Sequence, residues 1–576
     1  MNGRGGIVTF FLFLFLSIII LLQILSMVQS DRLYERINRF DETFKNIAPI
    51  RGAKDEPGAS IVDEQYPGDE GDWLVWRLGA EPATLNLITA KDLYADWVTS
   101  GSIFESLLEY DLDKVELKPL LAKSYEISVD GLEITFCLRD DVWFSDGEPI
   151  TTDDILFTYE TIMNPGVDAA RMANYFKDIE RVVKIDKQVI KFVMRKPYFK
   201  FLEMVGGMPI LPKHIYEFTD PEEFNKHRSN QVGSGPYIFE KWNVGREIVL
   251  RRNERYWGKR PKLDKLVYRI ITNEVAALQA LQSHDIDFMR PDPEQFANRS
   301  GDKEFTDKFY CLKYWTPGDG YRYIGWNQTS PFFKDRRVRL AMTHIINREV
   351  IISNLLKGLG HSITGPFYVF GPQNDPSIEP WPYAPQRAKE LLDEAGWVDT
   401  DGDGLRDKDG IAFRFSFMIV SQSPFHERLA KLLKDEAAKV GIEVILDPYE
   451  WSVFTERLNT RSFEAVTLAW TGSIQKDPYQ IWHSSQIESR GSNFVDFRNA
   501  KADAIIEKAR QTMDADERNK LYHRFHQLLH EEQPYTFLLS RPSMRFLDRR
   551  FENVKPHKLG LDGEEWYVPK QKQRYK

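Results

Sequence analysis

The stretch of residues 233–257 constrains the fold more than any other part of the chain. It begins Gly-Ser-Gly-Pro, and two strand-like runs follow, residues 237–242 and 247–252, joined by an Asn-Val-Gly-Arg turn. Two glycines around one residue allow a tight backbone passage that side chains would block. Because two runs joined by an Asn/Gly turn form a hairpin, the sequence predicts a β-hairpin over residues 237–252.

A second block, residues 130–163, combines a turn, a strand and a helix start. Asp130-Gly131 predicts a hairpin turn, and residues 134–138 alternate apolar and polar side chains, which indicates a half-buried strand. Thr152 precedes two acids, so we expect it to cap a helix over residues 153–163.

Three motifs resemble signatures of the family 5 extracellular solute-binding proteins, the oligopeptide, dipeptide and nickel receptors of ABC importers. They are the Phe-Ser-Asp-Gly-Glu-Pro-Ile-Thr-Thr-Asp-Asp run at residues 144–154, the stretch of residues 233–257, and the segment of residues 336–348. Asn347 stands where the family usually has Asp. The resemblance extends from about residue 73 to about residue 556.

The resemblance implies a two-lobed α/β fold similar to that of periplasmic binding proteins, a "Venus flytrap", with an extra subdomain on the first lobe. Lobe one would comprise residues 73–103, 233–323 and 540–576, the extra subdomain residues 104–232, and lobe two residues 324–539. The resemblance also implies that a solute binds between the lobes, that the lobes close by a hinge motion, and that ABC permease subunits receive the solute. Neither catalysis nor a cofactor is expected.

The N-terminal segment predicts attachment to a membrane. Residues 7–28 are almost wholly apolar, and at about 1.5 Å per residue a helix of this length spans a bilayer. Because no cysteine for lipid attachment and no clear Ala-x-Ala site follows, the sequence favours an uncleaved signal anchor, residues 1–30, over a cleaved signal peptide. Several arginines follow the span, so charge leaves its orientation open. The resemblance instead places the bulk of the chain in the periplasm or extracytoplasmic space, held to the cell membrane by this single helix.

Residues 31–72 predict a short helical stalk followed by an acidic linker. Apolar residues recur at alternating steps of four and three, the spacing of a heptad seam. They are Leu33, Ile37, Phe40, Phe44 and Ile47. A helix lying on the lipid surface would show the same pattern. Gly, Pro, Asp and Glu are frequent in residues 52–72, which indicates a solvated linker.

Composition excludes some classes of function. The net charge is -9 and the pI about 5.8, which argues against nucleic-acid binding because phosphate binding needs clustered Lys and Arg. The two cysteines, Cys137 and Cys311, leave two alternatives, a pair of buried thiols or one disulfide. No Gly-x-Ser-x-Gly motif, Walker loop or zinc-protease motif occurs, so no enzyme is predicted.

The loop that follows Trp470 is the leading candidate for ligand contact. In peptide-binding members of the family a strand ends Trp-x-x-Asp, and the Asp pairs with the α-ammonium group of the ligand, a strong charge-assisted bond. Here Trp470 matches, Thr471 and Gly472 follow, and Ser473 stands at the Asp position. Since a serine cannot supply the negative charge, a peptide amino terminus is a less secure ligand. Asp477 could substitute if the loop bends inward.

Three further residues are predicted to line the ligand cleft. Trp451 flanks this loop in the sequence, and Trp326 and Asn327 lie at the expected hinge. Aromatic faces in a cleft suit peptide, sugar or aromatic ligands. Each of these rings could equally belong to the hydrophobic core.

Residues 399–410 resemble a Ca²⁺-binding loop. Acidic side chains stand at four ligand positions, but Gly410 occupies the position of the bidentate Glu. The acidic residues are Asp399, Asp401, Asp403 and Asp407. Because the bidentate ligand is missing, the sequence favours a solvated hairpin here, with a Ca²⁺ site as the weaker alternative.

Three histidines, His523, His526 and His530, share one face of a predicted helix. Apolar residues already supply the buried face of this helix, so we expect the histidines to face solvent. The sequence therefore predicts no metal site there.

Two hypotheses of function follow. The first is a membrane-tethered receptor that captures peptides or peptide-like solutes between two lobes and delivers them to an ABC importer. The second is a sensory or scaffold protein of the same fold that oligomerises through the stalk at residues 33–47.

Overall fold

The computed structural model describes residues 68–90, 92–227, 231–488 and 491–575. All of them lie in one compact unit, Asp63–Lys576. The predicted signal anchor, residues 1–30, lies outside the described residues, as do residues 31–67 of the predicted stalk and linker. Among the helices that are described, none is long and apolar enough to cross a membrane.

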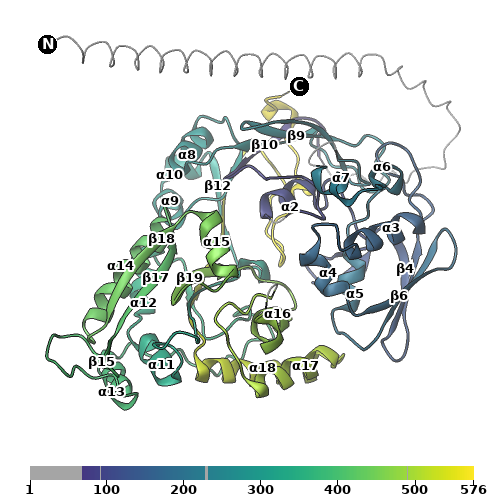
Figure 1. Cartoon of the computed structure of the whole chain (residues 1–576). Coiled ribbons are helices and arrows are strands. Elements are labelled where there is room, and N and C mark those ends of the chain that lie inside the picture. The colour runs from purple at the N-terminus through teal and green to yellow at the C-terminus, as the bar shows by residue number, and fades with distance from the viewer. Residues whose placement is uncertain (1–67, 91, 228–230, 489–490, 576) are drawn as a thin grey trace, which may run out of the picture. The chain divides into compact units, whose positions relative to one another are not determined.

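The predicted hairpin is confirmed, and it forms one edge of a seven-stranded sheet. β8 (Tyr237–Asn243) and β9 (Glu247–Arg252) pair in antiparallel orientation. The order continues from β9 through β10 (Lys265–Ile270), β1 (Trp73–Leu78), β11 (Phe288–Met289), β21 (Ser543–Asp548) and β12 (Phe309–Tyr314). β1 runs parallel to its neighbours β10 and β11. One sheet therefore collects strands from both ends of the described chain (Figure 1).

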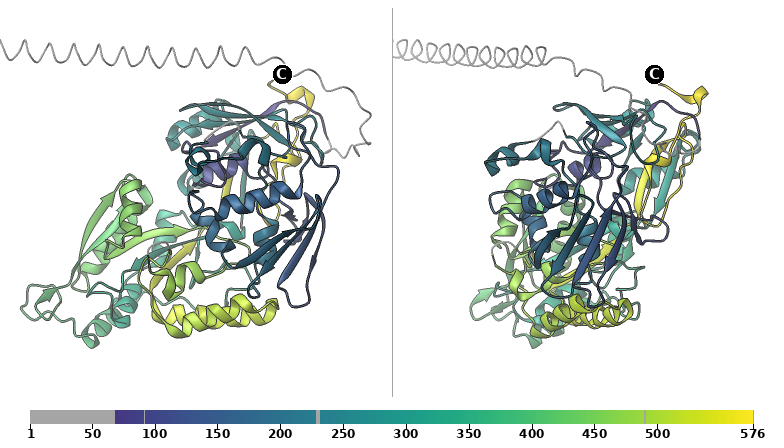
Figure 2. Two further views of the ribbon diagram at one scale, coloured as in Figure 1. Left: turned by 45° about the vertical axis from the view of Figure 1, so that its right-hand side comes forward. Right: turned by 90° about the vertical axis from the view of Figure 1, so that its right-hand side faces the viewer.

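The segment between β1 and β8 forms a separate antiparallel sheet of four strands, drawn in dark blue in Figure 2. Its order is β4 (Ala122–Ile127), β5 (Glu133–Leu138), β7 (Val189–Met194) and β6 (Ile179–Lys184). A small hairpin of β2 (Leu108–Tyr110) and β3 (Leu117–Pro119) precedes it. These strands lie within residues 104–232, the segment expected to form the extra subdomain, whose boundaries stay a prediction.

The helix after β5 has a different cap from the one predicted. α3 spans Thr152–Met163, and Thr151 caps it. The Thr151 hydroxyl accepts a hydrogen bond from the N–H of Asp153, while the Asp154 carboxylate accepts one from the N–H of Thr151. The Thr152 hydroxyl donates instead to the carbonyl of Asp186. Two successive threonines offer two possible caps, and this tertiary contact decides between them.

A six-stranded sheet forms the core of the second lobe. Its order is β14 (His361–Ser362), β20 (Tyr535–Ser540), β13 (Tyr321–Trp326), β19 (Ala465–Trp470), β17 (Arg414–Val420) and β18 (Glu443–Tyr449). Its main helices are α11 (Arg336–His344), α13 (Pro385–Glu394), α14 (Pro424–Ala438), α15 (Trp451–Asn459), α17 (Ala500–Gln511) and α18 (Ala515–Glu532). The expected start of lobe two at residue 324 falls inside β13, because β13 pairs with β19 from Tyr321 onward.

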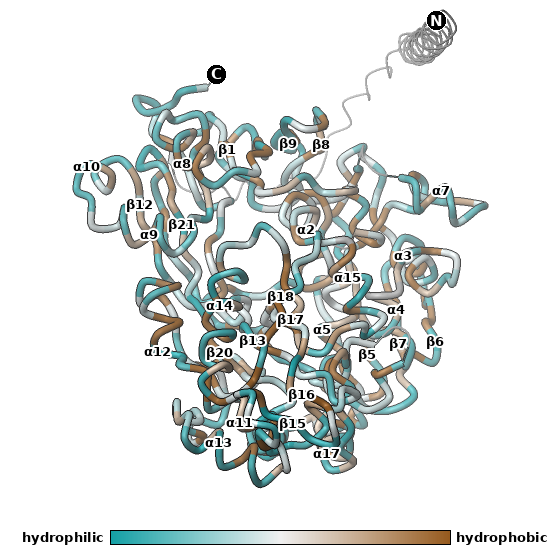
Figure 3. Tube along the Cα trace, turned by 60° about the vertical axis from the view of Figure 1, so that its left-hand side comes forward, coloured by the Kyte–Doolittle hydropathy of each residue, from teal (hydrophilic) through white to brown (hydrophobic). Residues whose placement is uncertain are grey.

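Both faces of the six-stranded sheet are buried. In β13, Ile324 and Trp326 belong to one hydrophobic cluster, whereas Tyr321 and Tyr323 belong to another. This follows from the strand period, since successive side chains point to opposite faces. Figure 3 shows hydrophobic stretches at the strands labelled β13 and β17. The period of β13 therefore sets which of its side chains share a face.

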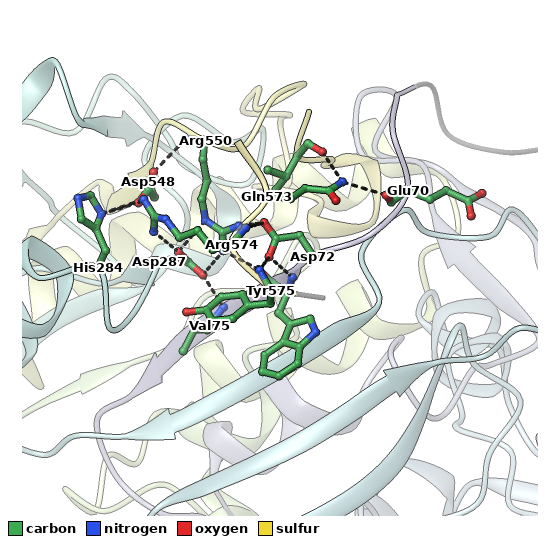
Figure 4. Close-up of polar contacts among 12 residues, drawn as sticks. Glu70, Asp72, Val75, His284, Asp287, Asp548, Arg550, Gln573, Arg574 and Tyr575 are labelled. Carbon is green, nitrogen blue, oxygen red and sulfur yellow. Dashed lines mark hydrogen bonds and ion pairs between the residues drawn. The ribbon is translucent and has the colours of Figure 1, made fainter. Parts of the chain in front are cut away.

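Buried ion pairs join the start of β1 to the C-terminal tail (Figure 4). The Arg550 guanidinium pairs with the carboxylates of Asp72 and Asp287, and Asp287 also accepts the N–H of Val75. The N–H of Tyr575 donates to Asp72. Because a buried charge is stable only when it is paired, these contacts fix the beginning of the described fold against its end.

The chain passes between the two large sheets twice. Residues 315–320 lead from β12 to β13, and residues 541–542 lead back from β20 to β21. We call these two segments the crossovers. Both are short, so a movement of one sheet relative to the other would concentrate its backbone changes there.

Candidate functional site

The predicted ligand loop, residues 471–477, follows β19 and lies against the first crossover. A Cβ atom on Gly472 would lie 1.7 Å from the carbonyl oxygen of Pro317. A Cβ atom on Gly320, whose φ is +67°, would lie 1.9 Å from the carbonyl oxygen of Trp470. Glycine at both positions therefore allows the loop and the crossover to touch.

The first residues of this loop carry no charge. The half-buried ring of Trp470 stacks on that of Phe494, with the ring centres 5.9 Å apart and the planes 7° apart. Thr471 is exposed, and Ser473 is half-buried and donates its hydroxyl hydrogen to the Gln475 carbonyl at 3.3 Å. The position at which the resemblance places an ammonium-binding carboxylate is therefore neutral.

Asp477 points to partners within the protein. Its carboxylate accepts hydrogen bonds from the Arg510 Nε and from the Tyr198 hydroxyl, each at 2.9 Å, and from the N–H of Tyr479 at 3.0 Å. The Asp477 and Arg510 side chains are 6% and 11% exposed. Burial raises the pKa of Tyr198 well above its usual range, and Asp477 adds to this, so the phenol stays a hydrogen-bond donor. The charge of Asp477 is thus compensated by Arg510.

Lys476 is a cation of this loop that the sequence analysis did not single out. Its side chain is almost fully buried, with Nζ 4.6 Å from the centre of the Tyr321 ring and 3.4 Å from the Thr471 carbonyl oxygen. Gln373 bonds both the N–H and the C=O of Lys476. Burial lowers the pKa of Lys476 to about 7. A lysine in a loop gives no sequence signal of burial, because its environment comes from a distant strand.

Trp326 and Asn327 lie in the core. The indole N–H of Trp326 donates to the Thr536 hydroxyl at 3.0 Å, and its ring packs near Phe333 with no solvent exposure. The Asn327 amide donates to backbone carbonyls, among them that of Phe463 at 2.7 Å. Both residues stabilise the end of β13, and we leave them out of the proposed ligand site.

Trp451 has the opposite environment. It opens α15, its ring stacks on Phe454 with the ring centres 5.8 Å apart, and it is 57% exposed. The structure therefore sets Trp470 and Gly472 against the first crossover and turns Asp477 toward Arg510 and Tyr198. It buries Trp326 and Asn327, and it leaves Trp451 on the surface.

The acidic loop of residues 399–410 is exposed. Carboxylate oxygens of Asp399, Asp401 and Asp403 lie within 4.8 Å of one another, and they form the one such group of potential metal ligands among the described residues. Asp399 accepts the N–H groups of Gly402 and Gly404. The fourth predicted ligand, Asp407, bonds the N–H and hydroxyl of Thr400 instead. The hydrogen bonds of this loop are those of a turn, and a Ca²⁺ site stays the weaker alternative to a solvated hairpin.

The expectation that the three histidines of α18 face solvent is wrong for His526. Its ring is fully buried, with Nε2 2.9 Å from the Thr364 hydroxyl and Nδ1 accepting the N–H of Asp375. Burial lowers the pKa of His526 to about 4, so the ring is neutral at pH 7. Residues 364–375 cover this face of the helix. The sequence does not reveal that this segment lies there, so the burial of His526 could not be predicted from it.

Both cysteines are free thiols, so the disulfide alternative is wrong. Cys137 lies in β5 and Cys311 in β12, which belong to different sheets. Burial raises the pKa of the Cys311 thiol to about 11, so it is not a nucleophile near neutral pH.

Comparisons with known proteins agree with the resemblance in the motifs. The family described as bacterial extracellular solute-binding proteins, family 5, middle, matches residues 116–491. The oligopeptide-binding protein AppA of Bacillus subtilis is 32% identical over 536 residues, which cover 91% of this chain and 96% of AppA. A solved structure of Bacillus subtilis AppA in complex with a nonapeptide covers 88% of this chain and 100% of that chain, at 30% identity and a TM-score of 0.78.

A second solved structure extends the likeness. NikZ from Campylobacter jejuni, in complex with Ni(L-His), covers 86% of this chain and 99% of that chain, at 27% identity and a TM-score of 0.75. The predicted two-lobed α/β fold of periplasmic binding proteins is thereby confirmed, and the protein is a solute-binding protein and not an enzyme. By its motifs, its fold and these likenesses, the chain belongs to family 5 of the bacterial extracellular solute-binding proteins.

Proposed function

We propose that this protein is the extracytoplasmic receptor of an ABC importer, and that it binds a peptide or peptide-like solute between its two lobes. The observation that carries the proposal is the contact between the ligand loop, residues 471–477, and the first crossover. A solute held by this loop would sit beside the segments that join the lobes. Closing the lobes over it would then need backbone changes in the crossovers alone.

The likeness to AppA in complex with a nonapeptide supports a peptide-like solute. We assign Trp470, Thr471, Gly472, Ser473 and the exposed ring of Trp451 to the ligand surface, with Asp477 holding the base of the loop. The closed form would present both lobes to the permease subunits, which pass the solute across the membrane. Nucleic acid is not a partner, as the negative net charge indicates.

Native mass spectrometry of the purified full-length protein in detergent, followed by denaturing release, tests the proposal. We expect a co-purifying solute with the fragmentation pattern of a peptide or peptide-like molecule. Adding back that solute should reduce the radius of gyration in small-angle scattering, because the lobes close. A protein that carries no solute, and whose melting temperature and radius of gyration no peptide changes, would contradict the proposal.

We also propose that residues 1–30 tether the protein to the cell membrane. The apolar run at residues 7–28 and the lack of a clear cleavage site support this. The full-length protein should stay in the membrane fraction after alkaline carbonate extraction. A variant in which a cleavable signal peptide replaces residues 1–30 should move to the soluble fraction, and equal release of both proteins would count against the tether.

A further inference from the structure

Four arginines gather around the two crossovers, and we call them the arginine cluster. They are Arg290, Arg322, Arg541 and Arg545. Arg541 lies in the second crossover, and Arg545 lies in β21, which follows it. Arg290 comes directly after β11, and because Met289 pairs with Phe546, the next position sets Arg290 beside Arg545. Arg322 lies in β13, the strand that the first crossover enters.

Aromatic rings, rather than carboxylates, contact the guanidinium groups of Arg290 and Arg322. The Cζ of Arg290 lies 3.6 Å from the ring centre of Trp97 in α2 (Leu93–Thr99). The Cζ of Arg322 lies 4.3 Å from the ring centre of Phe425 in α14. The hydrogen bonds of Arg545 go to neighbours in its own strand. Within the part of the chain that the structure describes, no member of the cluster forms an ion pair with a carboxylate.

The positive charges of the cluster are partly withdrawn from water. All four side chains are half-buried. Burial, and next the charge of Arg545, lowers the pKa of Arg290 to about 9, and burial and Arg541 lower the pKa of Arg322 to about 9. Burial also lowers the pKa of Arg541 and of Arg545. Each of the other three groups is therefore close enough to Arg541 for their positive charges to repel, and the fold keeps them together.

The carboxylates near Arg541 already have partners. Asp319 accepts a hydroxyl hydrogen bond at 2.6 Å and a backbone N–H at 2.7 Å. Asp292 caps the helix α9 (Pro293–Ser300), and Glu274 pairs with Arg77 at 3.0 Å. These acids raise the pKa of Arg541, opposing its burial, but they do not bond it. The cluster therefore keeps a positive charge that the described fold does not neutralise.

Arg550 shows how this protein compensates a buried arginine. It follows β21 and pairs with two buried carboxylates, Asp72 and Asp287 (Figure 4). By contrast, the Nε of Arg290 is fully buried and has no hydrogen-bond partner among the described residues. An unpaired buried donor or cation is costly. An anion bound beside Arg290 would therefore supply a partner that the described residues do not provide.

The ligand loop also lacks the negative charge that would bind the amino terminus of a peptide. Ser473 replaces the carboxylate that would bind an ammonium group, and Lys476 adds a buried cation three residues later. Lys476 rests on Tyr321, the residue before Arg322 in β13. Basic side chains thus lie on both sides of the first crossover.

We propose that the solute of this protein is an anion with at least two carboxylate or phosphate groups, and that the arginine cluster binds them. This inference rests on the proposed function, and it names the class of solute for the same site. Planar guanidinium groups suit carboxylate and phosphate, which accept paired charge-assisted hydrogen bonds. Two or more anionic groups are needed because the cluster spans both crossovers and forms no ion pair with an acid among the residues that the structure describes.

Titration calorimetry on the full-length protein in detergent tests this inference. The anionic probes are triglutamate, citrate and pyrophosphate, and the comparison probes are trialanine and trilysine. The variants are Arg290→Gln and Arg545→Gln. The matched control is Arg251→Gln, which removes an exposed arginine from β9 of the same sheet.

We expect an anionic probe to bind, and its affinity to fall as salt is added. Each cluster variant should weaken it by about tenfold to a hundredfold, the effect of one lost charge-assisted bond, and Arg251→Gln should not. Without ligand, the cluster variants should melt at or above the wild-type temperature, because an unpaired buried cation is removed. Binding of triglutamate alone would identify an acidic peptide, citrate alone a non-peptide carboxylate, and pyrophosphate alone a phosphate compound.

Two results would overturn the inference and leave the proposed function intact. One is closure of the lobes around trialanine or trilysine with equal affinity in the wild type and in Arg290→Gln. The other is anion binding that neither cluster variant weakens. If no probe of any charge binds or reduces the radius of gyration, the proposed function fails together with the inference.

Discussion

The carboxylate of Asp477 accepts a hydrogen bond from the Nε of Arg510 at 2.9 Å, and both side chains are nearly buried. The hydroxyl of Tyr198 donates to the same carboxylate. Asp477 belongs to the ligand loop, Arg510 to α17, and Tyr198 to the segment expected to form the extra subdomain. One carboxylate therefore joins the base of the loop to two other parts of the fold.

Replacing Asp477 with Asn should destabilise the protein. The substitution keeps the shape of the side chain but leaves Arg510 a buried cation without a counter-charge, which costs about 3 kcal/mol. Chemical denaturation measures the loss. Asp307→Asn is the matched control, because Asp307 pairs with Lys303 on the surface, where such a pair contributes about 0.5 kcal/mol. An equal loss of unfolding free energy in both variants would contradict a larger stabilising contribution from the buried Asp477–Arg510 pair.

Replacing Gly472 with Ala should lower both the melting temperature and the affinity for solute. The added Cβ would meet the Pro317 carbonyl oxygen at 1.7 Å, so the ligand loop must move away from the first crossover. Such overpacking costs about 1–3 kcal/mol. The control is Gly301→Ala, where a Cβ meets nothing within 4 Å and φ is negative. A Gly472→Ala protein with wild-type melting and affinity would contradict the packing described here.

Protonation of His526 should destabilise the protein in acid. Burial lowers its pKa from 6.5 to about 4, so between these values the unfolded chain binds the proton and the folded chain does not. The free energy of unfolding should therefore fall as pH falls, by about 2 kcal/mol between pH 7 and pH 5 from this ring alone.

Denaturant titrations of His526→Asn at the two pH values isolate this contribution. Asn keeps an acceptor for the N–H of Asp375, and its pH dependence should be shallower than that of the wild type. The exposed His361 provides the control His361→Asn, which should keep the wild-type slope. The same slope in all three proteins would contradict the assignment.

Deprotonation of Lys476 should stabilise the protein in alkaline solution. Burial lowers its pKa to about 7, below the 10.5 of a free lysine, so the unfolded chain binds the proton over this range. The free energy of unfolding should rise from pH 7 to pH 9 by about 2 kcal/mol, as the folded ammonium loses its proton. Lys476→Met should be more stable at pH 7 and lose this rise, whereas Lys431→Met, on the exposed face of α14, should keep it.

Local sequence determined the features whose causes lie within a few residues. The hairpin of β8 and β9 follows from its turn and its two runs, and the order of the motifs along the chain indicates the family. The cap of α3 shows the limit of this reasoning. Thr151 and Thr152 are both good caps, and the contact of Thr152 with Asp186 decides between them.

The candidate site depended on distant segments. Sequence reasoning singled out Trp470 to Ser473 because the family motif marks them, but it could not place Trp326 in the core. The strand period shows that Trp326 and Ile324 share a face, but the sheet order shows what covers that face.

By itself, the sequence determined the family and the two-lobed α/β fold, because these follow from ordered motifs and local backbone preferences. The ligand loop that it singled out stays a prediction. The tertiary structure alone decided which charges meet. Asp477 finds its counter-charge Arg510 in α17. Two members of the arginine cluster lie in the strands β13 and β21, one directly follows β11, and one lies in a crossover. Burial and electrostatic pairing depend on which segments are neighbours in space, and a single sequence does not state that.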